Sequence, residues 1–156
     1  MAGGRTAALL LATALAVLPL GCGSGEGEDS LPVGTISKAQ FLKQARAICA
    51  QGTKEAQKLD DAAWEKYEPD HITTDEAVLN KISLALLPAR EKEFQRLRAL
   101  GLPKGDEKYV DAMLTAAEEG VEEGREDPAA LRDWPPHFGF SRSYEMGAKY
   151  GLEGCW

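Results

Sequence analysis

Residues 37–67 have the sequence SKAQFLKQARAICAQGTKEAQKLDDAAWEKY, which is the pattern of one long amphipathic helix and indicates a helical fold. Ser37 and Gln40 have the spacing of a capping box, and Ile36 and Phe41 have that of a hydrophobic staple, so two signals mark the same helix start. At 1.5 Å per residue we expect a helix about 45 Å long. Its small and apolar residues recur every three or four positions, at Phe41, Ala45, Ile48, Gly52, Ala56, Leu59 and Ala63.

A second helix is predicted to open at residues 73–76 and to run as far as Gly101. Thr73-Thr74-Asp75-Glu76 has the spacing of another capping box, with acids in the first turn that favour the helix dipole. Pro88 cannot donate the hydrogen bond that a helix interior needs, so we expect a kink or a restart near Leu87.

Two more helices are predicted before the C-terminus. Asp106 is a candidate cap for the third helix, and Asp127-Pro128 should end it. The last helix should begin near Ser141 and meet Gly151 as its C-cap. No segment shows a sustained period of two with β-branched enrichment, so the sequence predicts an all-α bundle of about four helices with a kinked second helix. The candidate inward residues of the last helix are Tyr144, Ala148 and Tyr150.

The N-terminal residues have the pattern of a bacterial lipoprotein signal peptide. A short region with one Arg is followed by an apolar run over residues 6–20, which is shorter than the roughly 20 residues that span a bilayer as a helix. Leu18-Pro19-Leu20-Gly21-Cys22 then resembles the lipobox, although Pro19 departs from its usual pattern. We therefore expect residues 1–21 to be removed and Cys22 to carry the lipid anchor, which holds the mature protein on the membrane surface.

Residues 22–35 predict a flexible tether, and residues 36–156 a helical domain. The tether is rich in Gly, Ser and acids. The whole chain has 25 acids and 18 bases, and removal of Arg5 with the signal peptide leaves 17 bases against 25 acids, a formal charge of −8. Such a protein lacks the basic footprint of a nucleic-acid binder, so none is expected as a partner.

Three cysteines in an exported chain leave one thiol unpaired, which is a liability in an oxidising compartment. Acylation of Cys22 would remove the odd one and leave Cys49 and Cys155 as the only available pair. A disulfide between them would staple the bundle and, in the chain-entropy model, stabilise it by about 4 to 5 kcal/mol. The alternative is two separate buried thiols.

A dense row of acids occupies the second half of the third predicted helix, with Arg125 as the nearby base. Like charges four residues apart cost about 0.2 to 0.5 kcal/mol a pair, and acids in a last turn oppose the helix dipole, so the pattern is locally unfavourable. It predicts either a solvated face or a weak binding surface for Ca²⁺ or a cationic partner. The row consists of Glu118, Glu119, Glu122, Glu123 and Glu126.

A row of small residues runs along the same helix at every fourth position. Small side chains let another helix backbone approach closely, at the expense of about 1 kcal/mol for each Gly relative to Ala. The row indicates either ordinary close packing or a docking groove for a partner. It consists of Ala112, Ala116, Gly120 and Gly124.

No constellation of residues predicts catalysis, a metal site or a cofactor. His71 and His137 both lie beside prolines, and Pro69 interrupts the one Glu-x-x-His spacing, Glu68 to His71. No G-x-S-x-G occurs, and Cys49 and Cys155 lack the C-x-x-C spacing of redox enzymes. The chain is therefore not expected to be an enzyme. Three tryptophans serve either core packing or an apolar site, namely Trp64, Trp134 and Trp156.

Three groups of residues stand in order along the mature chain. They are Ser37-Lys38-x-x-Phe41 with Ala45-x-x-Ile48-Cys49, Leu97-x-x-Leu100-x-x-Pro103-x-Gly105-Asp106-Glu107, and Tyr150-Gly151-Leu152-x-x-Cys155. In these motifs the chain resembles a group of small uncharacterised exported proteins and lipoproteins of actinobacteria. The resemblance implies a secreted or anchored helical domain with one disulfide between the first helix and the C-terminus. It implies no activity.

Two functions agree with these features. The first is a non-enzymatic interaction module of the bacterial cell envelope, anchored on the extracytoplasmic face of the membrane and presenting helix faces to another envelope protein. The second is a binder of a small apolar or cationic ligand held between helices near Trp134. The sequence does not indicate the partner, the ligand or the oligomeric state.

Overall fold

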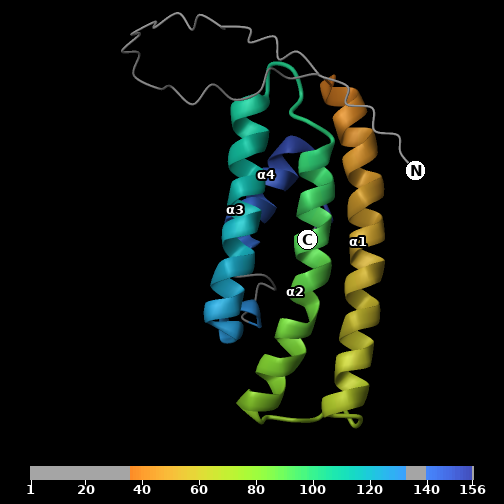
Figure 1. The fold of residues 1–156 in the computed structure, drawn as a ribbon, viewed down its shortest axis with the longest axis vertical. Coiled ribbons are helices and arrows are strands. Elements are labelled where there is room, and N and C mark those ends of the chain that lie inside the picture. The colour runs from red at the N-terminus through yellow and green to blue at the C-terminus, as the bar shows by residue number, and fades with distance from the viewer. Residues whose placement is uncertain (1–35, 133–139, 156) are drawn as a thin grey trace, which may run out of the picture. The chain divides into compact units, whose positions relative to one another are not determined.

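The structure, a computed structural model, describes residues 36–132 and 140–155, all of which lie in one compact unit, Leu31–Trp156. The predicted signal peptide, Cys22 and the tether lie outside the described residues. No strand occurs in the described part of the chain, so the predicted all-α bundle of four helices is confirmed. Its elements are α1 Lys38–Tyr67, α2 Glu76–Ala99, α3 Glu107–Glu126, the 3-10 turn η1 Pro128–Leu131, and α4 Ser141–Tyr150 (Figure 1).

Helix α1 begins and ends where the sequence predicts. Ser37 Oγ accepts a hydrogen bond from the Gln40 backbone N–H at 3.3 Å, and Gln40 Oε1 accepts one from the Ser37 N–H at 3.2 Å, which completes the capping box. Leu59 is 37% exposed, so its predicted inward position is wrong. It lies on the part of α1 where Ala56 and Ala63 form the buried face, and these small side chains leave the larger neighbour at the rim. The buried residues of α1 are Phe41, Ala45, Cys49, Gly52, Ala56 and Ala63.

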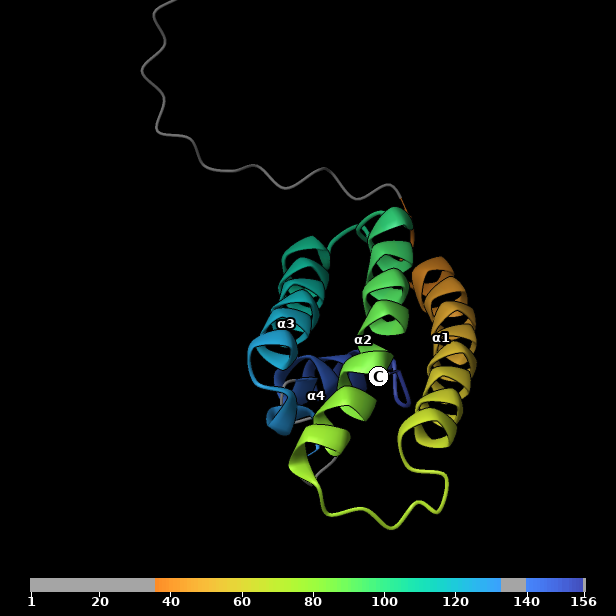
Figure 2. The same cartoon turned by 60° about the horizontal axis from the view of Figure 1, so that its bottom comes forward.

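Helix α2 begins two residues later than a cap at Thr73 would place it. Asp75 is the N-cap, and its side chain accepts a hydrogen bond from the Ala77 N–H at 2.8 Å. Thr73 Oγ1 instead accepts from the Asp75 N–H at 3.1 Å, so the predicted capping box is wrong. Asp is the stronger cap, and here it stands directly before the helix. Pro88 lies inside one continuous helix, whose axis bends along its length (Figure 2).

Helices α3 and α4 have the predicted ends but different details. Asp106 occupies the N-cap position without a side-chain cap hydrogen bond. Gly151 ends α4 in the left-handed conformation at φ 99°, as expected of a C-cap glycine. Tyr144 is 45% exposed, so its predicted inward position is wrong. The buried face of α4 follows the three- and four-residue spacing back from Tyr150, through Gly147 and Ser143.

The helices form a row in which α1 packs along α2 and α2 along α3, while α4 packs against α3 and η1 against both α2 and α3 (Figures 1 and 2). The core lies between them. The predicted disulfide is confirmed, because Cys49 and Cys155 are bonded with their Cα atoms 4.9 Å apart. It fixes the C-terminal residues to the middle of α1. None of the described helices has the length and apolar character needed to cross a membrane. The largest fully buried apolar side chains are Phe41, Phe94, Leu97, Met113, Leu114 and Leu152.

Candidate functional site

The acidic row predicted on α3 forms a continuous surface. The five glutamates of this row, together with Thr115, line one open hollow of about 450 Å³. We call the face formed by these five glutamates the acidic surface. They come together because α3 is a regular helix whose opposite face is buried. Within the described residues, no three His, Cys, Asp or Glu side chains are placed to hold a metal ion. The acidic surface consists of Glu118, Glu119, Glu122, Glu123 and Glu126.

Arginines from three helices partly neutralise this surface. Arg98 of α2 donates to Glu118 Oε2 at 2.9 Å, and Arg142 of α4 lies 3.5 Å from Glu119. Arg125, the one base that the sequence pattern placed nearby, pairs with Glu122. Glu123 and Glu126 have no ion-pair partner among the described residues. They lie at one end of the surface and leave it net negative.

Arg98 is the best-bonded of these bases. It also donates to Asp111 Oδ1 at 2.8 Å and to Thr115 Oγ1 at 2.9 Å, and its hydrogen bond with Glu118 is the main cause that raises its pKa. These bonds tie the end of α2 to α3 and fix the direction of the Glu118 carboxylate. The sequence pattern indicated only Glu118 on α3. Its partner Arg98 lies twenty residues earlier in the chain, and no local pattern links the two.

A second, smaller hollow of about 180 Å³ lies between α2 and α3 and shares Glu118 and Glu122 with the acidic surface. Phe94 and Val121 are buried core residues that form its apolar part. Glu91, also at its rim, accepts a hydrogen bond from Arg125 at 2.6 Å. The two hollows together make one face with a negative rim and a small apolar base.

The predicted row of small residues serves close packing where the structure describes its contacts. Ala116, Gly120 and Gly124 are all buried. A Cβ atom added at Gly124 would lie 2.6 Å from Leu131 Cδ2 of η1, so this side chain already occupies the space over the glycine. At Gly124 the groove is therefore filled from within the chain.

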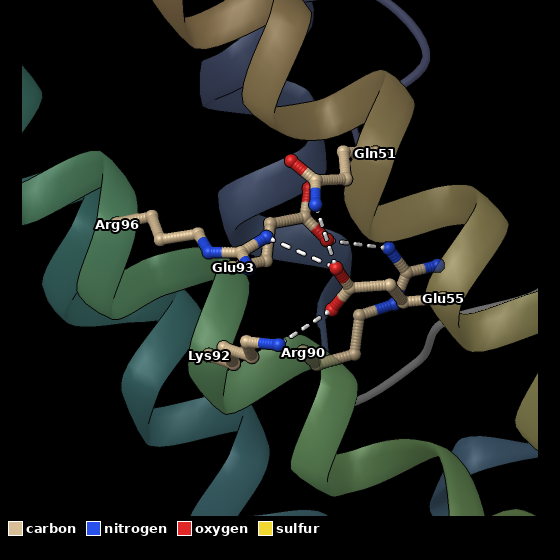
Figure 3. Close-up of polar contacts among 6 residues, drawn as sticks. All are labelled: Gln51, Glu55, Arg90, Lys92, Glu93 and Arg96. Carbon is tan, nitrogen blue, oxygen red and sulfur yellow. Dashed lines mark hydrogen bonds and ion pairs between the residues drawn. The ribbon is translucent and has the colours of Figure 1, made fainter.

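A polar cluster that the sequence pattern did not predict lies between α1 and α2 (Figure 3). Glu93 of α2 is 1% exposed and faces Gly52 of α1. Beside it, Glu55 of α1 pairs with Lys92 at 3.2 Å and with Arg96 at 3.2 Å. The hydrogen bond from Lys92 is the main cause that holds the pKa of Glu55 below its usual value. The signal in the sequence was a Glu at an inward position of α2, four residues before the core residue Leu97.

The remaining candidates do not converge on these places. His71 stacks on Trp64 with the ring centroids 4.9 Å apart, in the connection that follows α1. His137, Trp134 and Trp156 lie outside the described residues, as does the place near Trp134 where a small ligand was expected.

No protein-family model, no curated protein and no solved structure matches the chain. Any functional proposal therefore rests on the surfaces of this protein alone.

Proposed function

We propose that this protein is a non-enzymatic interaction module of the bacterial cell envelope, held on the extracytoplasmic face of the membrane by a lipid on Cys22. In this proposal the acidic surface of α3 is the contact for a basic segment of another envelope protein. The lipobox-like sequence supports the anchor. The carboxylates gathered on one open face support the contact.

The observation that carries the proposal is the unequal pairing of the acids. Glu118 pairs with Arg98 and thereby ties α3 to α2, whereas Glu123 and Glu126 are exposed and have no ion-pair partner within the described residues. An exposed pair is individually worth at most about 1 kcal/mol, so such a face acts mainly through orientation and the rate of association. A flexible basic segment fits this geometry better than a compact metal ion does, since carboxylates along a helix are spread and do not converge.

A crosslinked pull-down from the native envelope tests both parts. The wild type is compared with Cys22→Ala, which removes the anchor, and with Glu123→Lys/Glu126→Lys, which reverses charge without breaking an ion pair. Glu65→Lys/Glu153→Lys is the matched control, because both acids are exposed and lie away from α3. We expect one partner that is recovered with the wild type and the control and lost with both other variants. Recovery that is equal for all four proteins would contradict the proposal.

The second candidate function is a small-ligand binder, and the hollow between α2 and α3 is the observation that favours it. Its carboxylate rim above the core residues Phe94 and Val121 suits a small organic cation, and its volume of about 180 Å³ is below the 300 to 1,000 Å³ of common ligand pockets. A ligand of this kind would raise the melting temperature of the purified chain by mass action. Screening of small organic cations by thermal shift, with Gln95→Trp at the exposed rim to obstruct the hollow, separates this function from the first.

A further inference from the structure

Glu93 is the one acid of the described domain whose side chain is fully enclosed. Its side chain has 0% exposure, and Oε2 accepts a hydrogen bond from Arg90 at 2.9 Å. Its other oxygen, Oε1, is buried and has no hydrogen-bond partner. An ionised carboxylate buried with one unpaired oxygen is unfavourable, because neither water nor a donor compensates the lost hydration.

The carboxylate lies directly under the backbone of α1. A Cβ atom added at Gly52 would come within 2.3 Å of Glu93 Oε2, so only a glycine lets the two helices approach this closely. Any change in the position or hydration of this carboxylate is therefore transmitted to the α1–α2 contact.

The charges that face Glu93 come from both helices. Arg90 and Arg96 on α2 favour its ionised form, whereas Glu55 on α1 opposes it, and Lys92 and Arg96 are both engaged with Glu55. Residues 151–155, tied to α1 through Cys49, have Glu153 as their only titratable side chain, and it is exposed. Burial outweighs these charges and raises the pKa of Glu93 above its usual value. The closed contact therefore favours the protonated acid.

The two halves of α1 are held with different strength. Its first half carries the buried Phe41 and Ala45 and is fixed by the disulfide at Cys49. After Gly52 the only buried residues are Ala56 and Ala63, which offer little apolar surface to α2. A segment with few buried contacts opens locally before the rest of the domain does. Residues 53–67 are therefore the part of α1 that can respond to Glu93.

We propose that Glu93 and Gly52 form a proton-operated latch. With Glu93 protonated, residues 53–67 of α1 close on α2, and when the proton leaves to water this segment loosens while the disulfide retains the first half. The latch does not depend on the lipid anchor or on the acidic surface. It makes the exposure of the inner faces of α1 and α2 depend on the pH of the surrounding solution.

Proton binding linked to closure of the helix contact sets the direction of the pH dependence. A carboxyl with a raised pKa in the closed state contributes its full stability below the pKa of the open state, near 4.5, and loses it as the pH rises through the closed-state pKa. One proton changes the closing equilibrium by at most about tenfold per pH unit. The acids with lowered pKa values, Glu55 and Asp106, act at lower pH and in the opposite direction.

Hydrogen exchange of the full mature chain between pH 5 and pH 8, corrected for intrinsic exchange rates, tests the latch. In the wild type we expect protection factors of residues 53–67 to fall with rising pH, by up to about tenfold per pH unit, while those of residues 38–50 stay constant. Glu93→Gln should remove this pH dependence. Glu93→Met, of similar length and without charge, provides the same comparison if the glutamine variant does not fold.

The matched control is Asp60→Asn, because burial also raises the pKa of Asp60, which lies on the same segment. Asp60 is only partly buried, whereas Glu93 is fully enclosed, so this variant should keep most of the wild-type pH dependence. Three results would overturn the latch: constant protection of residues 53–67 in the wild type, an equal fall in both halves of α1, or a pH dependence that Asp60→Asn removes and Glu93→Gln retains.

Discussion

The side chain of Glu93 lies against the backbone of α1 at Gly52, which predicts a strong coupling between substitutions at these two positions. In Gly52→Ala the added Cβ would lie 2.3 Å from Glu93 Oε2, 2.5 Å from Cδ and 2.9 Å from Cγ, so the carboxyl must move and weaken its bond with Arg90. Overpacking of this kind costs about 1 to 3 kcal/mol. Replacing a helical Gly with Ala stabilises the helix by about 1 kcal/mol, so we expect the free energy of unfolding to fall by up to about 2 kcal/mol.

In a Glu93→Ala background the three clashing atoms are absent, and the same Gly52→Ala change should stabilise the protein by about 1 kcal/mol. The coupling energy is then about 1 to 3 kcal/mol, measured by urea unfolding of the four proteins of the cycle at one pH, followed by circular dichroism. Thr53→Ala, at an exposed neighbour, should change stability by no more than about 0.5 kcal/mol in either background. Additivity of the Gly52 and Glu93 changes to within about 0.5 kcal/mol would refute the close contact.

Two further predictions concern the ties between helices. Reduction of the disulfide, or Cys155→Ser, should lower the free energy of unfolding by about 4 to 5 kcal/mol, because Cys155 follows Cys49 by 106 positions and the bond closes a long loop. Thermal melts with and without reductant measure this loss. Arg98→Ala should lower the free energy of unfolding by about 1 to 2 kcal/mol, a range that allows for the partial exposure of Arg98. The loss should be smaller at high salt, because salt screens ion pairs. Arg142→Ala should have almost no effect, because its ion pair is exposed. Urea unfolding at low and high salt would contradict this prediction if the two variants lost equal stability.

The sequence also indicated most of the candidate surface, but not how it is balanced. The spacing of the acids from Glu118 to Glu126 placed them on one helix face, and the structure gathers them there. Arg98 and Arg142, which neutralise part of this face, lie on other helices, and their approach depends on how those helices pack. Local periodicity contains no information on that packing.

The helix bounds at Ser37, Tyr67 and Gly151 could be predicted from local sequence, because caps and breakers act within four or five residues of the backbone groups that they affect. The enclosure of Glu93 opposite Gly52 and the position of Leu131 over Gly124 could not be predicted in this way. These contacts depend on the register and depth at which two helices meet, and close packing fixes both through side chains far apart in the chain.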